Sequence, residues 1–144
     1  ESVRIPILDA GDTAFTTNRP EFHCAYMPIS EQLRYKAIIS IEGNDVASNL
    51  KWAMNSNSVT IMPKPKFESW FCESKLKPWI HYIPIKDDYS DLELAIDFSI
   101  NRQEDTKEII RQANQYCSQF HDLSRQFILG ARVMDLYFSL QMDK

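Results

Sequence analysis

The residues best suited to chemistry follow an apolar run, AIISI at positions 37–41. Gly43 comes shortly after this run, and Asn44, Ser48 and Lys51 follow it. A glycine there lets a ligand approach the backbone, or permits a positive φ in a turn, because it has no Cβ. A helix that begins near Asn44 would present free N–H groups and a partial positive charge, which suit a phosphate. Ser48 would add a hydroxyl and Lys51 a charge, so the spacing indicates an anion site.

A plainer interpretation of the same residues stays open. Gly43 is then only part of a tight turn, and Asn44 or Asp45 is only the N-cap of the helix that follows. The chain contains neither G-x-G-x-x-G nor G-x-x-x-x-G-K-[ST], so neither phosphate-loop fingerprint applies. An acidic Asp45 beside the proposed site also weighs against an anion there.

The segments that must position these residues alternate between strand-like and helix-like patterns. Short β-branched runs such as AIISI are typical of strands that are buried on both faces of a sheet. This alternation predicts a parallel sheet with helical crossovers, a Rossmann-like member of the doubly wound α/β class. In such sheets ligands bind outside the carboxyl ends of the strands, which is where Gly43 stands. The expected strands are 3–8, 37–41, 58–62 and 79–85, and the expected helices between them are 31–36 (capped by Ser30), 45–55 and 67–71.

The last third of the chain is expected to be helical. Residues 90–93 (SDLE) read as a capping box at the start of the first helix. A third helix, from about Leu123 to Leu140, is apolar on too many faces for a simple surface helix. Phe127, Met134 and Phe138 should therefore expose a patch through which the chain self-associates. The stripes that define the first two helices are Leu92, Ala95, Ile96 and Ile100, then Ile109, Ala113, Tyr116, Cys117 and Phe120.

Composition narrows the class of protein. A chain of 144 residues with 44% apolar residues is typical of one soluble globular domain. The net charge of −4 lacks the basic footprint of nucleic-acid-binding proteins. Three widely spaced cysteines suit reduced thiols in a cytoplasm, and no cluster has the spacing of a metal site, so no metal is expected. We expect an irregular segment at 1–29, an α/β core at 30–103 and C-terminal helices at 104–144.

Two blocks of sequence carry a resemblance to a known family. They are SEQLRYKAIISIEGNDVASNLKWAMNSNSVTIMPKPKFESWF, from Ser30, and LKPWIHYIPIKDDYSDLE, from Leu76. Together they resemble the glycosyltransferase family 90 proteins, which include bacterial lipopolysaccharide core glycosyltransferases and eukaryotic protein O-glucosyltransferases. The versions ASNLKW and MPKPKFESWF are most similar to the bacterial branch.

The resemblance implies a two-domain GT-B fold, of which this chain is the C-terminal, donor-binding half. Such enzymes transfer a hexose from a UDP-sugar to a hydroxyl without a bound metal or other cofactor. It further implies that Gly43, Asn44, Ser48, Asn49 and Lys51 line the donor diphosphate, where aimed N–H groups stabilise the charge that develops on the leaving UDP. Many family members carry an arginine where Asn49 stands, and that arginine would neutralise the diphosphate. Here either Lys51 or a basic residue outside the motif takes this role, or this branch handles the leaving group differently. The resemblance also implies that the catalytic base is an aspartate in the other half, so the sequence assigns no catalytic residue within this chain.

The same resemblance assigns the nucleoside part of the donor. Glu68 aligns with the acidic position that accepts the ribose hydroxyls, and a carboxylate suits a diol because it accepts two hydrogen bonds. The alternative is that Glu68 only complements a helix N-terminus. Trp70, Phe71 and Trp79 could flank uracil, although Trp79 is expected to lie in the core.

The remaining polar residues receive plainer assignments. His81 is expected to be a structural strand residue, and the Asp87-Asp88 pair a solvated turn. Lys64 and Lys66 could face an anionic lipid-linked acceptor or the membrane surface.

The expected function is thus the UDP-hexose-binding part of a glycosyltransferase that acts on a lipopolysaccharide core acceptor. The expected location is the cytoplasm, at the cytoplasmic face of the inner membrane. The alternative is a non-catalytic nucleotide-binding or assembly module with the same sheet.

Overall fold

The computed structural model of the protein describes residues 24–142. The strand expected at 3–8 and most of the segment 1–29 lie outside the described residues.

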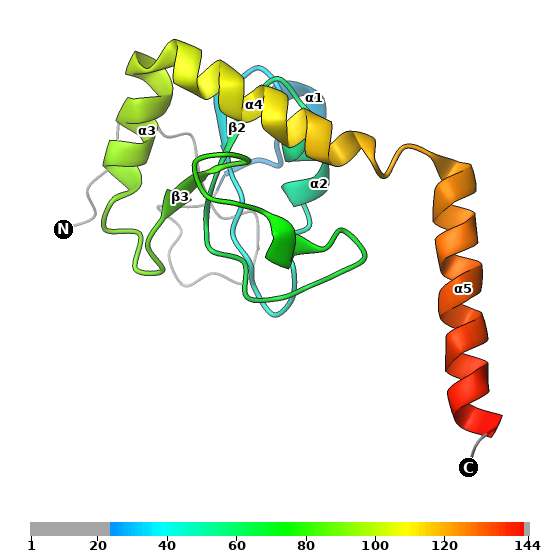
Figure 1. Ribbon diagram of the computed structural model, residues 1–144. Helices are drawn as coiled ribbons and strands as arrows, with labels where there is room; N and C mark the ends of the chain where they lie inside the picture. The colour runs from blue at the N-terminus through cyan, green and yellow to red at the C-terminus, as the bar shows by residue number, and fades with distance from the viewer. Residues whose placement is uncertain (1–23, 143–144) are drawn as a thin grey trace.

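The centre of the fold is a three-stranded parallel sheet in the order β1-β2-β3 (Figure 1). β1 is Ala37–Ile39, β2 is Val59–Pro63 and β3 is Ile83–Ile85. Ile61 in the middle strand pairs with Ile39 on one side and with Ile83 on the other. The prediction of a parallel α/β sheet is therefore confirmed, although β1 and β3 are shorter than the sequence pattern suggested.

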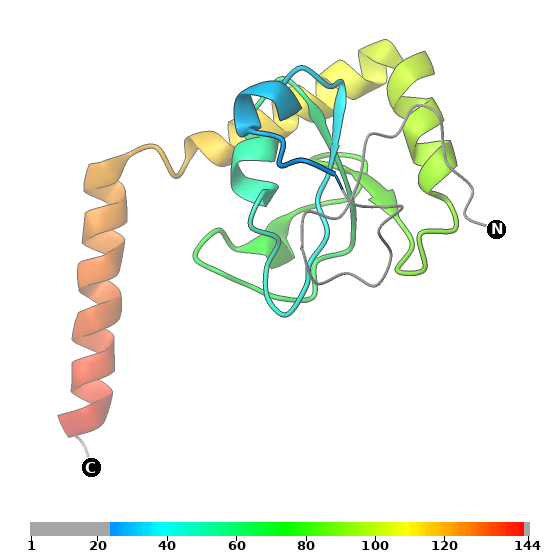
Figure 2. The same cartoon turned by 180° about the vertical axis from the view of Figure 1, so that it is seen from behind.

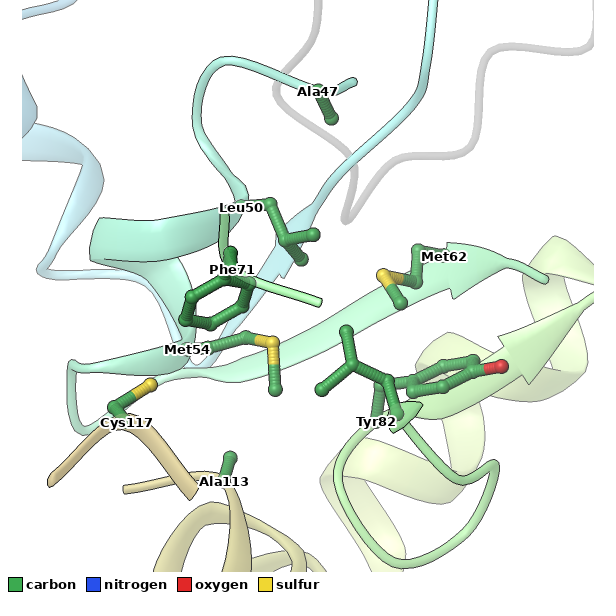
Figure 3. Close-up of a cluster of buried hydrophobic side chains, with 9 residues drawn as sticks. Ala47, Leu50, Met54, Met62, Phe71, Tyr82, Ala113 and Cys117 are labelled. Carbon is green, nitrogen blue, oxygen red and sulfur yellow. The ribbon is translucent and has the colours of Figure 1, made fainter. Parts of the chain in front are cut away.

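The central strand β2 separates two apolar clusters, because neighbouring side chains point to opposite faces of a sheet. On one face, Val59 and Ile61 pack with β3 and with α3 (Leu92–Asn101) and the start of α4 (Gln103–Ser118). On the other face, Met62 packs with the short helix α2 (Leu50–Met54) and the end of α4 (Figure 3). The second cluster comprises Ala47, Leu50, Met54, Met62, Phe71, Leu76, Tyr82, Ala113 and Cys117.

The C-terminal helices follow the predicted stripes. Ala95 and Ile96 are buried on α3, as are Ile109, Ala113 and Cys117 on α4. The third predicted helix is α5 (Leu123–Met142), which points away from the sheet (Figures 1 and 2). The prediction that its apolar residues stand exposed is confirmed.

Two helices begin at other residues than the sequence pattern predicted. The first helix is α1, Ile29–Gln32, and it follows Pro28, so Ser30 lies inside it and is not its cap. The predicted capping box at 90–93 is wrong. α3 begins at Leu92, so the residue before it is Asp91 and not Ser90, and Asp91 makes no side-chain cap bond. Its Oδ1 instead accepts from Lys86 N at 2.8 Å.

No helix forms at 67–71. Glu73 holds this segment in a turn, since its carboxylate accepts from both the N–H and the hydroxyl of Ser69 at 2.6 Å. A short 3-10 helix, η2, follows at Glu73–Lys75.

The strand expected at 79–85 begins only at Ile83. Trp79 has a φ of 63°, and the N–H groups of Ile80 and His81 bond to Lys77 O, so residues 79–81 form a turn. A residue in the left-handed region cannot continue a strand.

Candidate functional site

A cleft of about 120 Å³ opens where the three parallel strands end at their carboxyl sides. Each strand contributes the loop that follows it, as expected for open α/β sheets. The lining residues are Ser40, Ile41, Glu42 and Gly43 after β1, then Ala47 and Leu50, then Met62, Pro63, Lys64, Pro65, Lys66 and Phe67 at the end of β2, and Asp87 and Tyr89 after β3.

Polar contacts tie the three loops together across this cleft. Lys66 N donates to Glu42 Oε2 at 2.9 Å, and Phe67 N donates to Glu42 Oε1 at 3.3 Å. The Lys66 ammonium lies 3.0 Å from Asp87 Oδ2. The loop after β2 is thus held by an acid from each neighbouring loop.

Gly43 lies in the cleft, but its backbone has no positive φ. Of the two alternatives for this glycine, the one that required a positive φ is therefore wrong. A Cβ at this position would meet nothing within 4 Å, so neighbouring atoms do not require glycine. Close approach of a ligand to this backbone stays a prediction.

The helix expected from about Asn44 or Asp45 begins later. α2 starts at Leu50 and has 5 residues, so no helix N-terminus lies beside Gly43. The cause is a tertiary contact: Asn49 donates from Nδ2 to Ile39 O at 2.9 Å and accepts from Ser40 Oγ at 2.8 Å. These bonds hold the residue before α2 against the end of β1.

The cleft contains one of the five predicted diphosphate residues, namely Gly43. Asn44, Ser48 and Lys51 are exposed beyond its lining, on the loop and helix that follow. Asn49 is half-buried and uses its amide to join β1 to α2.

The predicted nucleoside residues also lie outside the cleft lining. Glu68 accepts from Ser74 Oγ at 2.7 Å, and Trp70 Nε1 donates to Gln126 Oε1 at 2.7 Å. Trp79 is 53% exposed, with its ring edge-on to Phe98, so the expectation that it lies in the core is wrong.

The titratable groups with shifted pKa values in the folded core lie away from the cleft. Burial raises the pKa of Tyr116 to about 12 and that of Cys117 to about 11. The Tyr116 hydroxyl shares its one proton between Phe71 O at 2.6 Å and Cys72 O at 2.9 Å, which fixes the loop before η2. Burial, with a smaller effect of the Lys77 charge, lowers the pKa of His81, whose Nδ1 accepts from Lys77 N at 3.0 Å. Tyr116 and His81 thus hold loops in place, whereas Cys117 belongs to the apolar core.

Within residues 24–142, no group of three or more His, Cys, Asp or Glu side chains is arranged to hold a metal ion. In the same part of the chain, no helix combines the length and apolar character needed to cross a membrane.

Sequence reasoning missed several residues of the cleft. Glu42 received no role, and Lys66 was expected to face an anionic lipid-linked acceptor or the membrane surface, whereas both residues line the cleft. Asp87 lies in an exposed turn as predicted, but its ion pair with Lys66 was not predicted. Phe67 and Tyr89 received no role either. The available signal was position, since each of these residues follows the carboxyl end of a strand.

Comparison with known proteins identifies the family. The model of Glycosyl transferase family 90 matches residues 9–141. O-glucosyltransferase LpsA of Dichelobacter nodosus is 40% identical over 135 residues, which are 94% of this chain and 42% of that protein.

More distant relatives cover the same region. Protein O-glucosyltransferase 3 of Rattus norvegicus is 27% identical over 143 residues, 96% of this chain and 28% of that protein. Uncharacterized protein 179R of Invertebrate iridescent virus 6 is 36% identical over 106 residues, 69% of this chain and 9% of that protein. The chain thus spans less than half the length of each of these relatives, and it belongs to glycosyl transferase family 90.

Proposed function

We propose that this chain is the donor-binding part of a glycosyltransferase that moves a hexose from a UDP-sugar to a hydroxyl of a lipopolysaccharide core. The observation that carries the proposal is the cleft at the carboxyl ends of the three strands, in a chain of this family. The relative LpsA is named an O-glucosyltransferase, which supports the reaction class. The acceptor and a location at the cytoplasmic face of the inner membrane rest on the family resemblance.

The chemistry requires positive charge at the leaving group. The acceptor oxygen bonds to the anomeric carbon while the bond from that carbon to the β-phosphate oxygen breaks, and UDP departs with the bonding electrons. The acceptor proton passes to a base that we expect in the rest of the protein. Backbone N–H groups near Gly43 and the ammonium groups of Lys64 and Lys66 supply the stabilising charge within this chain.

The cleft has a volume of about 120 Å³, whereas pockets that enclose a small-molecule ligand typically measure about 300–1,000 Å³. Part of the donor must therefore lie outside, along the loops that border it. Asn44, Ser48 and Lys51, which follow Gly43 in the sequence, stay our proposed partners of the diphosphate. Glu68 and Trp70 are proposed contacts of the ribose and uracil, beyond Phe67.

Calorimetric titration of the 144-residue chain with UDP, UDP-glucose and UDP-galactose tests the proposal. ADP is the matched control, because it carries the same diphosphate on a different base. We expect UDP to bind more tightly than ADP or uridine. An absence of UDP binding at millimolar concentration would overturn donor binding and favour a module that acts only in assembly.

A further inference from the structure

The loop after β2 presents two adjacent backbone N–H groups to the cleft. Those of Lys66 and Phe67 converge on one carboxylate, at 2.9 Å and 3.3 Å from its two oxygens. A pair of amides that grips both oxygens of a carboxylate has the donor arrangement that also binds a phosphate. The carboxylate belongs to Glu42, which lies 24 residues earlier in the sequence.

Acidic side chains of the protein itself contact these two amides and also the ammonium group of Lys66. Besides the two amides, the Lys66 ammonium is paired with Asp87 at 3.0 Å. Both side chains of that pair are more than 60% exposed, at 62% and 63%, so water screens their attraction and the pair opens at little cost. The 3.3 Å contact from Phe67 N to Glu42 is longer than a typical N–H···O bond and therefore weak.

Glu42 is also placed where it can move. The next residue is Gly43, which is exposed and has no side chain, and an added Cβ there would meet nothing within 4 Å, so this residue leaves room for the backbone beside Glu42 to move. Glu42 itself is only half-buried, and its carboxylate can be hydrated once it leaves the amides.

We propose that the amides of Lys66 and Phe67 form an anion-binding subsite of the cleft, and that Glu42 occupies this subsite until a phosphate group displaces it. The Lys66 ammonium exchanges Asp87 for the same phosphate. The identity of the phosphate, one of the two in a nucleoside diphosphate, rests on the proposed function; the subsite itself does not.

This arrangement makes Glu42 a competitor of the ligand. A ligand that binds only the open form has an apparent affinity reduced by the fraction of molecules that are open. Removal of the Glu42 carboxylate should therefore tighten anion binding, whereas removal of a mere support for the loop should weaken it. The two roles therefore predict opposite changes in the affinity for the anion when the Glu42 carboxylate is removed.

The test is a titration of the 144-residue chain with inorganic pyrophosphate, followed by calorimetry and by the backbone amide NMR signals of Lys66 and Phe67. Glu42→Ala removes the carboxylate, and Glu42→Gln keeps its shape in case the alanine variant loosens the loop. Asp45→Asn is the matched control, because it removes one negative charge from the same exposed loop without touching residues 66 and 67.

We expect Glu42→Ala and Glu42→Gln to bind pyrophosphate about tenfold more tightly than the unaltered chain, with both amide signals shifting. Asp45→Asn should raise the affinity for pyrophosphate by no more than about twofold, because the only change is the loss of one exposed charge that solvent and salt screen. Weaker or unchanged binding in both Glu42 variants, or amide signals that do not move, would overturn the subsite.

A UDP titration of the same variants separates this inference from the proposed function. If the Glu42 variants bind pyrophosphate more tightly but UDP binds no better than pyrophosphate, the anion subsite is supported and the proposal of nucleotide-sugar binding is refuted. If UDP binds and the amides of Lys66 and Phe67 do not respond to either ligand, the proposed function stands and the subsite falls.

Discussion

Replacing Asn49 with alanine should destabilise the fold, because the structure assigns this side chain a role between β1 and α2. Its Nδ2 donates to Ile39 O at 2.9 Å, and its Oδ1 accepts from Ser40 Oγ at 2.8 Å. Asn49→Ala removes both bonds. The substitution therefore tests whether Asn49 supports the loop or contacts the donor diphosphate.

The expected magnitude follows from the burial of the partners. Loss of the bond to Ile39 O costs about 1 kcal/mol, as for an ordinary net hydrogen bond. Ser40 is 2% exposed, so its hydroxyl is left in the interior without a partner, which costs about 1–3 kcal/mol more. We therefore expect the free energy of unfolding to fall by about 2–4 kcal/mol, a large share of the total for a small domain.

Urea unfolding followed by far-UV circular dichroism measures this loss. Asn44→Ala is the matched control: the same substitution in the same loop, at an exposed side chain with no hydrogen bond in the described part of the chain. It should change stability by less than about 0.5 kcal/mol. Equal stability of the two variants would refute the structural role of Asn49. If Asn49→Ala is fully stable but binds UDP more weakly, Asn49 contacts the donor diphosphate instead.

Three further predictions follow from the proposed site and from α5. Lys51→Ala should weaken UDP binding about fivefold and leave uridine binding unchanged, as expected for one exposed cation near a phosphate; equal losses in calorimetry would separate Lys51 from the phosphates. Gly43→Val should abolish UDP binding with an unchanged far-UV spectrum, since a Cβ there meets nothing within 4 Å; normal binding would remove this turn from the site. The 144-residue chain should form oligomers in light scattering and release no UDP from UDP-glucose in the presence of acceptor; a monomer with turnover would contradict the view that it is part of a larger enzyme.

The parts of the fold that the sequence predicted well are those decided by burial. β2 is buried along most of its length, so its apolar run predicts a central strand. The stripes of α3 and α4 have the helical period because one side of each helix packs on the sheet.

The errors occur where a distant contact overrides local preference. Residues 45–48 have a helical pattern, but Asn49 bonds to the end of β1, ten residues away, and delays α2. The bonds from Lys66 and Phe67 to Glu42 span 24 and 25 residues, and no spacing rule connects positions so far apart. The edge of the sheet that carries the cleft was therefore predictable from strand order, whereas the contacts that shape the cleft were not.

The surface of α5 constrains what can cover it. Phe127, Met134 and Phe138 are exposed on one side of the helix, and Leu129, Val133, Leu136 and Leu140 are exposed on another. At 3.6 residues per turn, successive side chains are about 100° apart, so the two sets lie roughly 150° from each other around the helix, with Arg125 and Arg132 next to the second set.

A paired helix covers only a narrow stripe of its neighbour, the seam of a coiled coil. One copy of α5 cannot therefore bury all of these residues on another, and self-association of this chain should yield mixed oligomers, not one defined dimer. Burial of both apolar sides of α5 at once needs a groove between two helices or strands. The relatives, of which this chain spans less than half, have additional length in which such a groove is expected.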